Sequence, residues 1–148
     1  MRARSYRLGL LMMSVVIAGC GGASTPLAPE RSFEGTWSGV TEQATPFAFT
    51  VTNGSITTVR FSAAVTTEQC GGTITGGADG TRPLGFVSGR QFSALGAVST
   101  GALIWSVDGT FPSAAAAAGT LQVRVAPPLT GSSGCVASAT LGWSATKD

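Results

Sequence analysis

The sequence predicts an all-β protein, a single antiparallel sandwich or small barrel of about eight short strands that follows an N-terminal signal peptide. Apolar and polar residues alternate with a period of two in several segments, which is typical of half-buried strands. Glycine, at 21 of the 148 residues, recurs between these segments and favours turns. Evenly spaced short strands with such turns are typical of sandwiches and small barrels.

The first predicted strands form a hairpin after an opening strand at 35–42, which carries Trp37. In the segment 47–52 the apolar residues Phe47, Phe49 and Val51 alternate with smaller or polar ones. Asn53-Gly54 follows, a pair that tolerates the positive φ angles of a two-residue turn. The return strand covers 55–65, and its alternation places one set of side chains on the core face: Thr57, Val59, Phe61, Ala63 and Val65.

The later strands are predicted at 90–98, 102–111, 119–126 and 134–146, the second of them carrying Trp105. Before them, residues 71–82 contain five glycines and indicate a short strand that runs into a turn-rich loop. The alanine run at 114–118 has helix propensity but is too short to form a helix alone, so we expect a connection with at most one helical turn. In the last strand, alternation puts Cys135 and Trp143 on the same apolar face.

The N-terminus has the order of an export signal. Arg2, Arg4 and Arg7 precede an apolar stretch at 8–18, which is about half the ~20 residues that a membrane-spanning helix needs. The residues Ile17-Ala18-Gly19-Cys20 resemble the lipobox of bacterial lipoprotein precursors. The resemblance implies cleavage before Cys20, lipidation of its sulfur with fatty acids such as palmitate, and a place in the bacterial cell envelope, anchored to a membrane and outside the cytoplasm.

This interpretation divides the chain into three parts: a lipoprotein signal peptide at 1–19, a lipidated flexible tether at 20–32 and a β domain at 33–148. The tether is rich in glycine, proline and small polar residues and lacks periodicity. Loss of the signal peptide removes three of the nine basic residues and none of the seven acidic ones, so the side chains of the mature protein sum to a charge of −1. Such a protein has no basic field for nucleic acid.

Few groups suited to catalysis remain in the mature chain. Histidine is absent, and the single tyrosine belongs to the signal peptide. A serine or cysteine nucleophile normally needs an adjacent base, most often histidine. Cys70 and Cys135 form an even pair in an exported protein, which is most simply a disulfide, while a metal or reactive-thiol site would lack both histidine and CxxC spacing. We therefore expect no catalytic residue, no metal and no cofactor.

Two chemical alternatives stay open. Paired carboxylates can hydrolyse glycosides without histidine, and four acids of the β domain are candidates for such a pair: Glu34, Glu42, Glu68 and Asp108. No spacing ties two of them to one site, so solvated surface acids are the simpler interpretation. Trp37, Trp105 and Trp143 could stack on sugars if they were exposed together, although their place in alternating strands favours core packing.

The mature chain also resembles a recurrent class of small secreted bacterial β domains. The residues that carry this resemblance are Gly35-Thr36-Trp37-Ser38-Gly39, the hairpin around Asn53-Gly54, Cys70, Ala118-Gly119-Thr120-Leu121, Cys135 and the closing Trp143-Ser144-Ala145. The class implies a fold and no catalytic residues. We expect a non-catalytic binding or structural module with an unidentified protein or glycan partner. The alternatives are a carbohydrate- or small-ligand-binding module and a carboxylate-based hydrolase.

Overall fold

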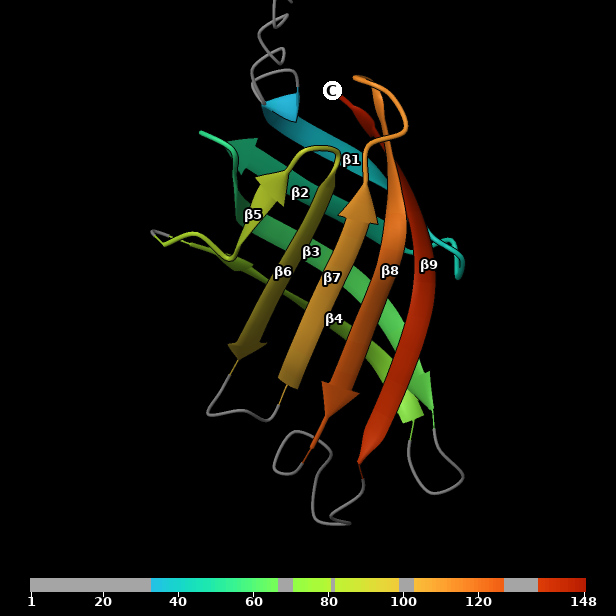
Figure 1. Cartoon of the computed structure of the whole chain (residues 1–148). Helices are drawn as coiled ribbons and strands as arrows, with labels where there is room; N and C mark the ends of the chain where they lie inside the picture. Colours follow the sequence, from blue (N-terminus) through green and yellow to red (C-terminus); the bar gives the residue numbers. More distant parts are fainter. Residues whose placement is uncertain (1–32, 67–70, 81, 99–102, 127–135) are drawn as a thin grey trace, which may run out of the picture.

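The protein is all-β in a computed structural model that describes residues 33–66, 71–80, 82–98, 103–126 and 136–148. These residues form nine antiparallel strands (Figure 1). In chain order they are β1 (Gly35–Thr41), β2 (Pro46–Thr52), β3 (Ser55–Thr66), β4 (Gly71–Asp79), β5 (Gly85–Ser88), β6 (Gln91–Val98), β7 (Leu103–Thr110), β8 (Ala116–Val125) and β9 (Ala137–Lys147). The predicted fold class is confirmed.

Eight of these strands close into a barrel, because the ladder that runs from β2 through β1, β9, β8, β7, β6 and β5 to β3 ends where β3 pairs with β2. β4 is the additional strand. It pairs with β3 over Thr58–Thr66, on the same edge on which β5 pairs with Ser55 and Ile56. In Figure 1, β6 to β9 form the near wall of the barrel and β1 to β4 cross behind them. Closure leaves only β4 as a strand that extends beyond the ring.

The hairpin of β2 and β3 turns at Asn53-Gly54 as predicted, with φ angles of 51° and 70°. The Glu34 carboxylate accepts hydrogen bonds from the backbone N–H groups of both turn residues, at 2.9 and 2.8 Å. The predicted alternation of the return strand is wrong at its start. A register shift between Thr50 and Val51 pairs Val51 with Ile56, so that Ile56 is fully buried in place of Thr57.

Three further strand predictions are corrected. The glycine-rich segment predicted as a short strand and loop is a nine-residue strand, β4, because β3 offers it a continuous ladder. The four-residue strand β5 was not predicted. The alanine run contributes Ala116, Ala117 and Ala118 to β8, where β9 pairs with all three. Tertiary pairing overrides the helix propensity of alanine there.

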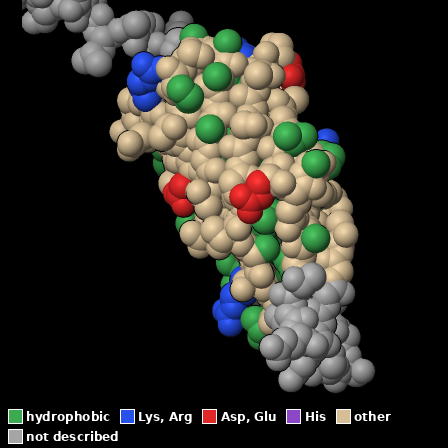
Figure 2. Space-filling model, turned by 90° about the vertical axis from the view of Figure 1, so that its right-hand side faces the viewer, with side chains coloured by type: hydrophobic (Ala, Val, Ile, Leu, Met, Phe, Trp, Pro, Cys, Tyr) green, Lys and Arg blue, Asp and Glu red, His purple; other side chains and the backbone are tan. Residues whose placement is uncertain are grey.

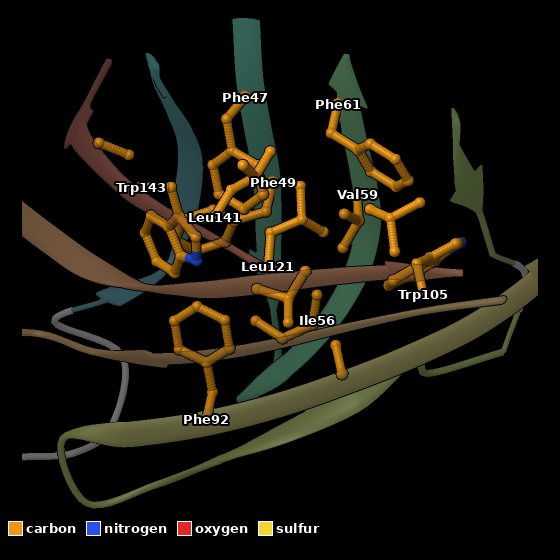
Figure 3. Packing of buried hydrophobic residues seen from close by; sticks show 14 of the residues in the cluster. Phe47, Phe49, Ile56, Val59, Phe61, Phe92, Trp105, Leu121, Leu141 and Trp143 are labelled. Atoms are coloured by element: carbon orange, nitrogen blue, oxygen red, sulfur yellow. The ribbon is translucent and has the colours of Figure 1, made fainter. Parts of the chain in front are cut away.

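The barrel interior is filled by aromatic and branched aliphatic side chains (Figure 3). Trp143 stacks on Phe47 with ring centroids 4.5 Å apart, and Phe92 of β6 contacts both Trp143, in the same wall, and Phe49, in the wall behind. At the other end of the cluster in Figure 3, the ring of Trp105 meets that of Phe61 edge-on. Thr41 is the one polar side chain among the buried residues of the described part.

The end of the barrel at which β1 begins is closed by Phe33. Its ring stacks on Phe111 with centroids 4.2 Å apart, and its carbonyl oxygen accepts a hydrogen bond of 3.0 Å from the Trp37 indole N–H. Trp37 itself is fully buried. The segment before β1 is therefore fixed to the core from Phe33 onward.

Two opposed glycines let the aromatic core approach the barrel wall. Gly109 of β7 pairs with Gly119 of β8, and both point inward by alternation. A Cβ on Gly109 would lie 2.5 Å from the Phe92 ring and 2.7 Å from the Trp143 ring, and a Cβ on Gly119 would lie 1.9 Å from the Asp108 carbonyl oxygen. Any side chain here would displace rings or backbone.

We expect Gly119→Ala to destabilise the protein by about 2–4 kcal/mol, because the new methyl group collides with backbone as well as with Trp143. Gly72→Ala is the matched control in another strand, since a Cβ there meets nothing within 4 Å. That substitution should be neutral or slightly stabilising, because alanine loses less backbone entropy on folding. Urea unfolding measures both. Equal effects at the two positions would contradict the packing described here.

Candidate functional site

A groove on the outer surface lies directly over this glycine pair. Its volume is about 590 Å³, and it extends across the outer faces of β5, β6, β7 and β8. We call it the Phe86 groove. Its walls are formed by Phe86, Ser88, Gln91, Ser93, Asp108, Thr110, Ala118 and Thr120, and its floor by Phe92, Gly109 and Gly119.

Strand register brings the side chains of the Phe86 groove into rows. Phe86 pairs with Ser93, Ser93 with Asp108, and Asp108 with Thr120, so these four residues form one row across four strands. Ser88, Gln91, Thr110 and Ala118 form the next row. Neighbouring strands lie about 4.8 Å apart, so each row spans about 14 Å. The groove thus offers an extended series of hydroxyl, amide and carboxylate groups beside one aromatic ring.

Phe86 is the most unusual member of this groove, because it is 67% exposed in a protein that buries its other described phenylalanines. β5 alternates, so Val87 is buried and its neighbours Phe86 and Ser88 face solvent. The residue opposite Phe86 on β6 is the small Ser93. The ring therefore presents a face to solvent without a covering side chain from that neighbour.

Among the described residues that line the groove, Asp108 supplies the only charged side chain. It is exposed, and no hydrogen bond or ion pair engages its carboxylate within the described ranges. Arg90 precedes the lining residue Gln91 in the chain, but its guanidinium is engaged in hydrogen bonds. Its Nε donates to the Phe111 carbonyl oxygen at 2.7 Å and its guanidinium also contacts the Pro112 carbonyl oxygen. Arg90 thereby ties the β5–β6 turn to the end of β7.

The remaining predicted acids have different surroundings. Glu34 is held by the hairpin turn, and Glu68 lies outside the described residues. Glu42 continues the row of Asp108 and Thr120, because its N–H bonds to the Gly142 carbonyl oxygen and its carboxylate leans over Gly142, 3.3 Å from where a Cβ would lie. The backbones at Gly142 and Asp108 lie two strands, or about 10 Å, apart, whereas the paired carboxyl groups of inverting glycosidases lie within about 9.5 Å of each other. Both carboxylates are exposed, whereas an acid catalyst of this kind is normally desolvated.

The three tryptophans proposed as sugar-stacking residues are all buried, with exposed fractions of 0% for Trp37, 1% for Trp105 and 4% for Trp143. None presents a ring face to solvent, which agrees with the core packing that their place in alternating strands favours. The indole N–H groups of Trp105 and Trp143 have no hydrogen-bond partner among the residues described. Their role is to fill the core, and the exposed aromatic residue is Phe86, which the sequence interpretation did not single out.

A second, smaller hollow of about 350 Å³ lies along β4 and is bordered by Arg60, Asp79 and Leu103. The Arg60 guanidinium donates to the Asp79 carboxylate at 2.8 Å. This hydrogen bond holds the pKa of Asp79 below its ordinary value and raises that of Arg60. Both side chains are largely exposed, so the pair contributes little to stability. Because the two charges of this pair neutralise each other, the hollow is a weaker candidate for a ligand site than the Phe86 groove.

Cys20, Cys70 and Cys135 all lie outside the described residues, so lipidation and the disulfide stay predictions. Within the part of the chain that the structure describes, no three acidic or cysteine side chains gather into a metal site, and no helix has the length and hydropathy of a membrane span. Figure 2 shows the side of the barrel at the right of Figure 1, where hydrophobic side chains lie dispersed among polar ones. No family model, curated protein or solved structure matches the chain.

We predict that Phe86 contributes almost nothing to folding. Phe86→Ala should change the free energy of unfolding by no more than about 0.5 kcal/mol, as is usual for surface positions. Phe92→Ala, in the adjacent strand, should cost about 3–5 kcal/mol because that ring is 4% exposed and packs against three aromatic side chains. Chemical denaturation of both variants provides the comparison. A large loss for Phe86→Ala would mean that the ring serves the fold and is not free for a ligand.

Proposed function

We propose that this protein is a lipid-anchored, non-catalytic binding module of the bacterial cell envelope. The lipobox-like sequence that ends at Cys20 supports the anchor, since lipid on its sulfur would attach the protein to a membrane. Residues 20–32 would act as the tether. If flexible, they span about 20 Å root-mean-square.

The distribution of titratable groups supports the proposal that the module is non-catalytic. The described core contains none, because every buried side chain is hydrophobic apart from Thr41. The Phe86 groove adds a single exposed carboxylate among neutral side chains. Proton transfer near neutral pH needs groups with matched or perturbed pKa values, usually in a desolvated cleft. A row of neutral hydrogen-bonding groups suits recognition better than turnover.

The place at which the tether would join the barrel indicates how far the groove would lie from the membrane. Phe33, the first described residue, stacks on Phe111, and the carbonyl oxygen of Phe111 accepts a hydrogen bond from Arg90, which precedes the lining residue Gln91. The tether would therefore join the barrel near the end of the wall at which Gln91 and Thr110 line the groove. A ligand held there would lie within about one tether length of the lipid surface.

The proposed disulfide is compatible with the same fold. Gly71 begins β4 and Ala137 begins β9, and both strands start at the end of the barrel opposite Phe33 (Figure 1). Cys70 and Cys135 precede these two residues by one and two positions. A bridge between them would link the additional strand to the closing strand, and it would limit the unfolded chain across a long loop.

The anchor is tested by phase separation in detergent. Full-length protein expressed in a bacterial host should partition into the detergent phase, whereas Cys20→Ser should be found in the aqueous phase or remain unprocessed. Ser24→Ala, in the tether, is the matched control and should partition like the unsubstituted protein. Unsubstituted protein in the aqueous phase would overturn the anchor. Turnover of esters, peptides or glycans that is lost in Glu42→Ala or Asp108→Ala would overturn the non-catalytic assignment.

A further inference from the structure

The chemistry of the Phe86 groove limits what it can bind. The described residues of its lining include one carboxylate and no arginine or lysine, which disfavours phosphate, nucleic acid and other anions. The strands beneath it are paired on both sides along the Asp108 row, so no backbone edge is available there for an added peptide strand. A ligand must instead use the ring, the hydroxyls and the carboxylate.

An aromatic ring beside hydroxyls and a carboxylate suits a neutral, hydroxyl-rich molecule. The face of an aromatic ring carries partial negative charge and attracts the C–H groups on the apolar face of a sugar. A carboxylate accepts two hydrogen bonds from neighbouring hydroxyls, while serine and threonine can both donate and accept. Phe86, Ser93, Asp108 and Thr120 provide these functions in one row.

The length of the row indicates more than one sugar unit. The strand spacing of about 4.8 Å is close to the length of one pyranose, so the step from Phe86 to Asp108 crosses about 10 Å and the step to Thr120 about 14 Å. Gln91 and Thr110 in the adjacent row add polar groups along the same direction. A single sugar would leave half of these groups without a partner.

We propose that the Phe86 groove binds a neutral oligosaccharide, with one ring stacked on Phe86 and hydroxyls of a later unit donating to Asp108. This inference deepens the proposed binding function and rests on it. The shallow, open shape predicts weak affinity for a single chain, with Kd on the order of 10⁻⁴ M. Tethering at a membrane keeps many copies close together, and multivalent contact with a polymer strengthens such binding.

The competing occupant is a lipid surface. Leu95 and Ile104 are 72% and 45% exposed on β6 and β7, and with Phe86 they form an apolar diagonal on the same wall. Neither Leu95 nor Ile104 lines the groove. Phe86 would therefore contact either a glycan or a lipid surface, whereas Asp108 would contact only the glycan and Leu95 only the lipid.

The test is isothermal titration of the purified full-length protein, in detergent micelles, with three probes: β-1,4-linked tetrasaccharides of glucose and of N-acetylglucosamine, and the α-1,4-linked tetrasaccharide of glucose. We expect at least one to bind. Phe86→Ala and Asp108→Asn should each weaken that binding about tenfold. Leu95→Ala, at an equally exposed apolar position outside the groove, should leave it unchanged. Thermal unfolding of each variant verifies that the fold is intact.

Three outcomes would overturn the inference. The first is no binding of any of the probes at about 10 mM, well above the expected Kd. The second is binding that Leu95→Ala weakens as much as Phe86→Ala does. The third is flotation of the Cys20→Ser protein with phosphatidylethanolamine–phosphatidylglycerol vesicles, lost in Phe86→Ala and Leu95→Ala but not in Asp108→Asn. The first and second leave the anchored, non-catalytic module in place. Release of reducing sugar from a bound probe would instead retain the groove and overturn the non-catalytic function.

Discussion

The contact on which most of the structure depends is that of the Trp143 and Phe92 rings with the backbone of Gly109 and Gly119. The absence of two side chains from the inner wall leaves room for two large rings, Phe92 from β6 and Trp143 from β9, which flank the glycine pair on the neighbouring strands. The rings in turn support Phe47 and Phe49 of the first hairpin, which links β9, β6 and β2 into one core. This packing leaves the buried indole N–H of Trp143 without a hydrogen-bond partner among the described residues, which lowers the free energy of unfolding. The outer surface of the same glycine pair is the floor of the groove.

Local chemistry and alternation were sufficient to predict the elements that depend on them. Asn53-Gly54 forms its turn because both residues adopt positive φ, and the face of the closing strand that carries Leu141 and Trp143 is buried as alternation requires. Elements that depend on a distant partner were not predictable in this way. β4 is a strand because β3 pairs with it, the bulge opposite Val51 depends on the register of two strands, and Ala116–Ala118 extend because β9 lies beside them.

The candidate site was less predictable than the fold for the same reason. The aromatic residues that the sequence offered as possible ligand contacts were three tryptophans in alternating strands, and all three are buried in the barrel interior. Phe86 lies in a strand of four residues, too short for alternation to indicate which way its ring faces. Ser93, Asp108 and Thr120 are separated by 12 or more positions in sequence and meet only through strand register. Asp108, for which the sequence indicated no partner, thus lies between Ser93 and Thr120 in a row of polar side chains.

The most direct test of the relation between core and groove is amide chemical-shift mapping of the full-length protein during titration with the tetrasaccharide probes. We predict that the largest shifts fall on Gly109, Gly119, Ser93 and Thr120, since the glycine amides form the floor beneath a bound chain. The amides of β4 around Thr75 and Asp79, which border the second hollow, should not move. Shifts confined to β4, or an unchanged spectrum at saturating probe, would contradict the binding of a ligand over the glycine pair.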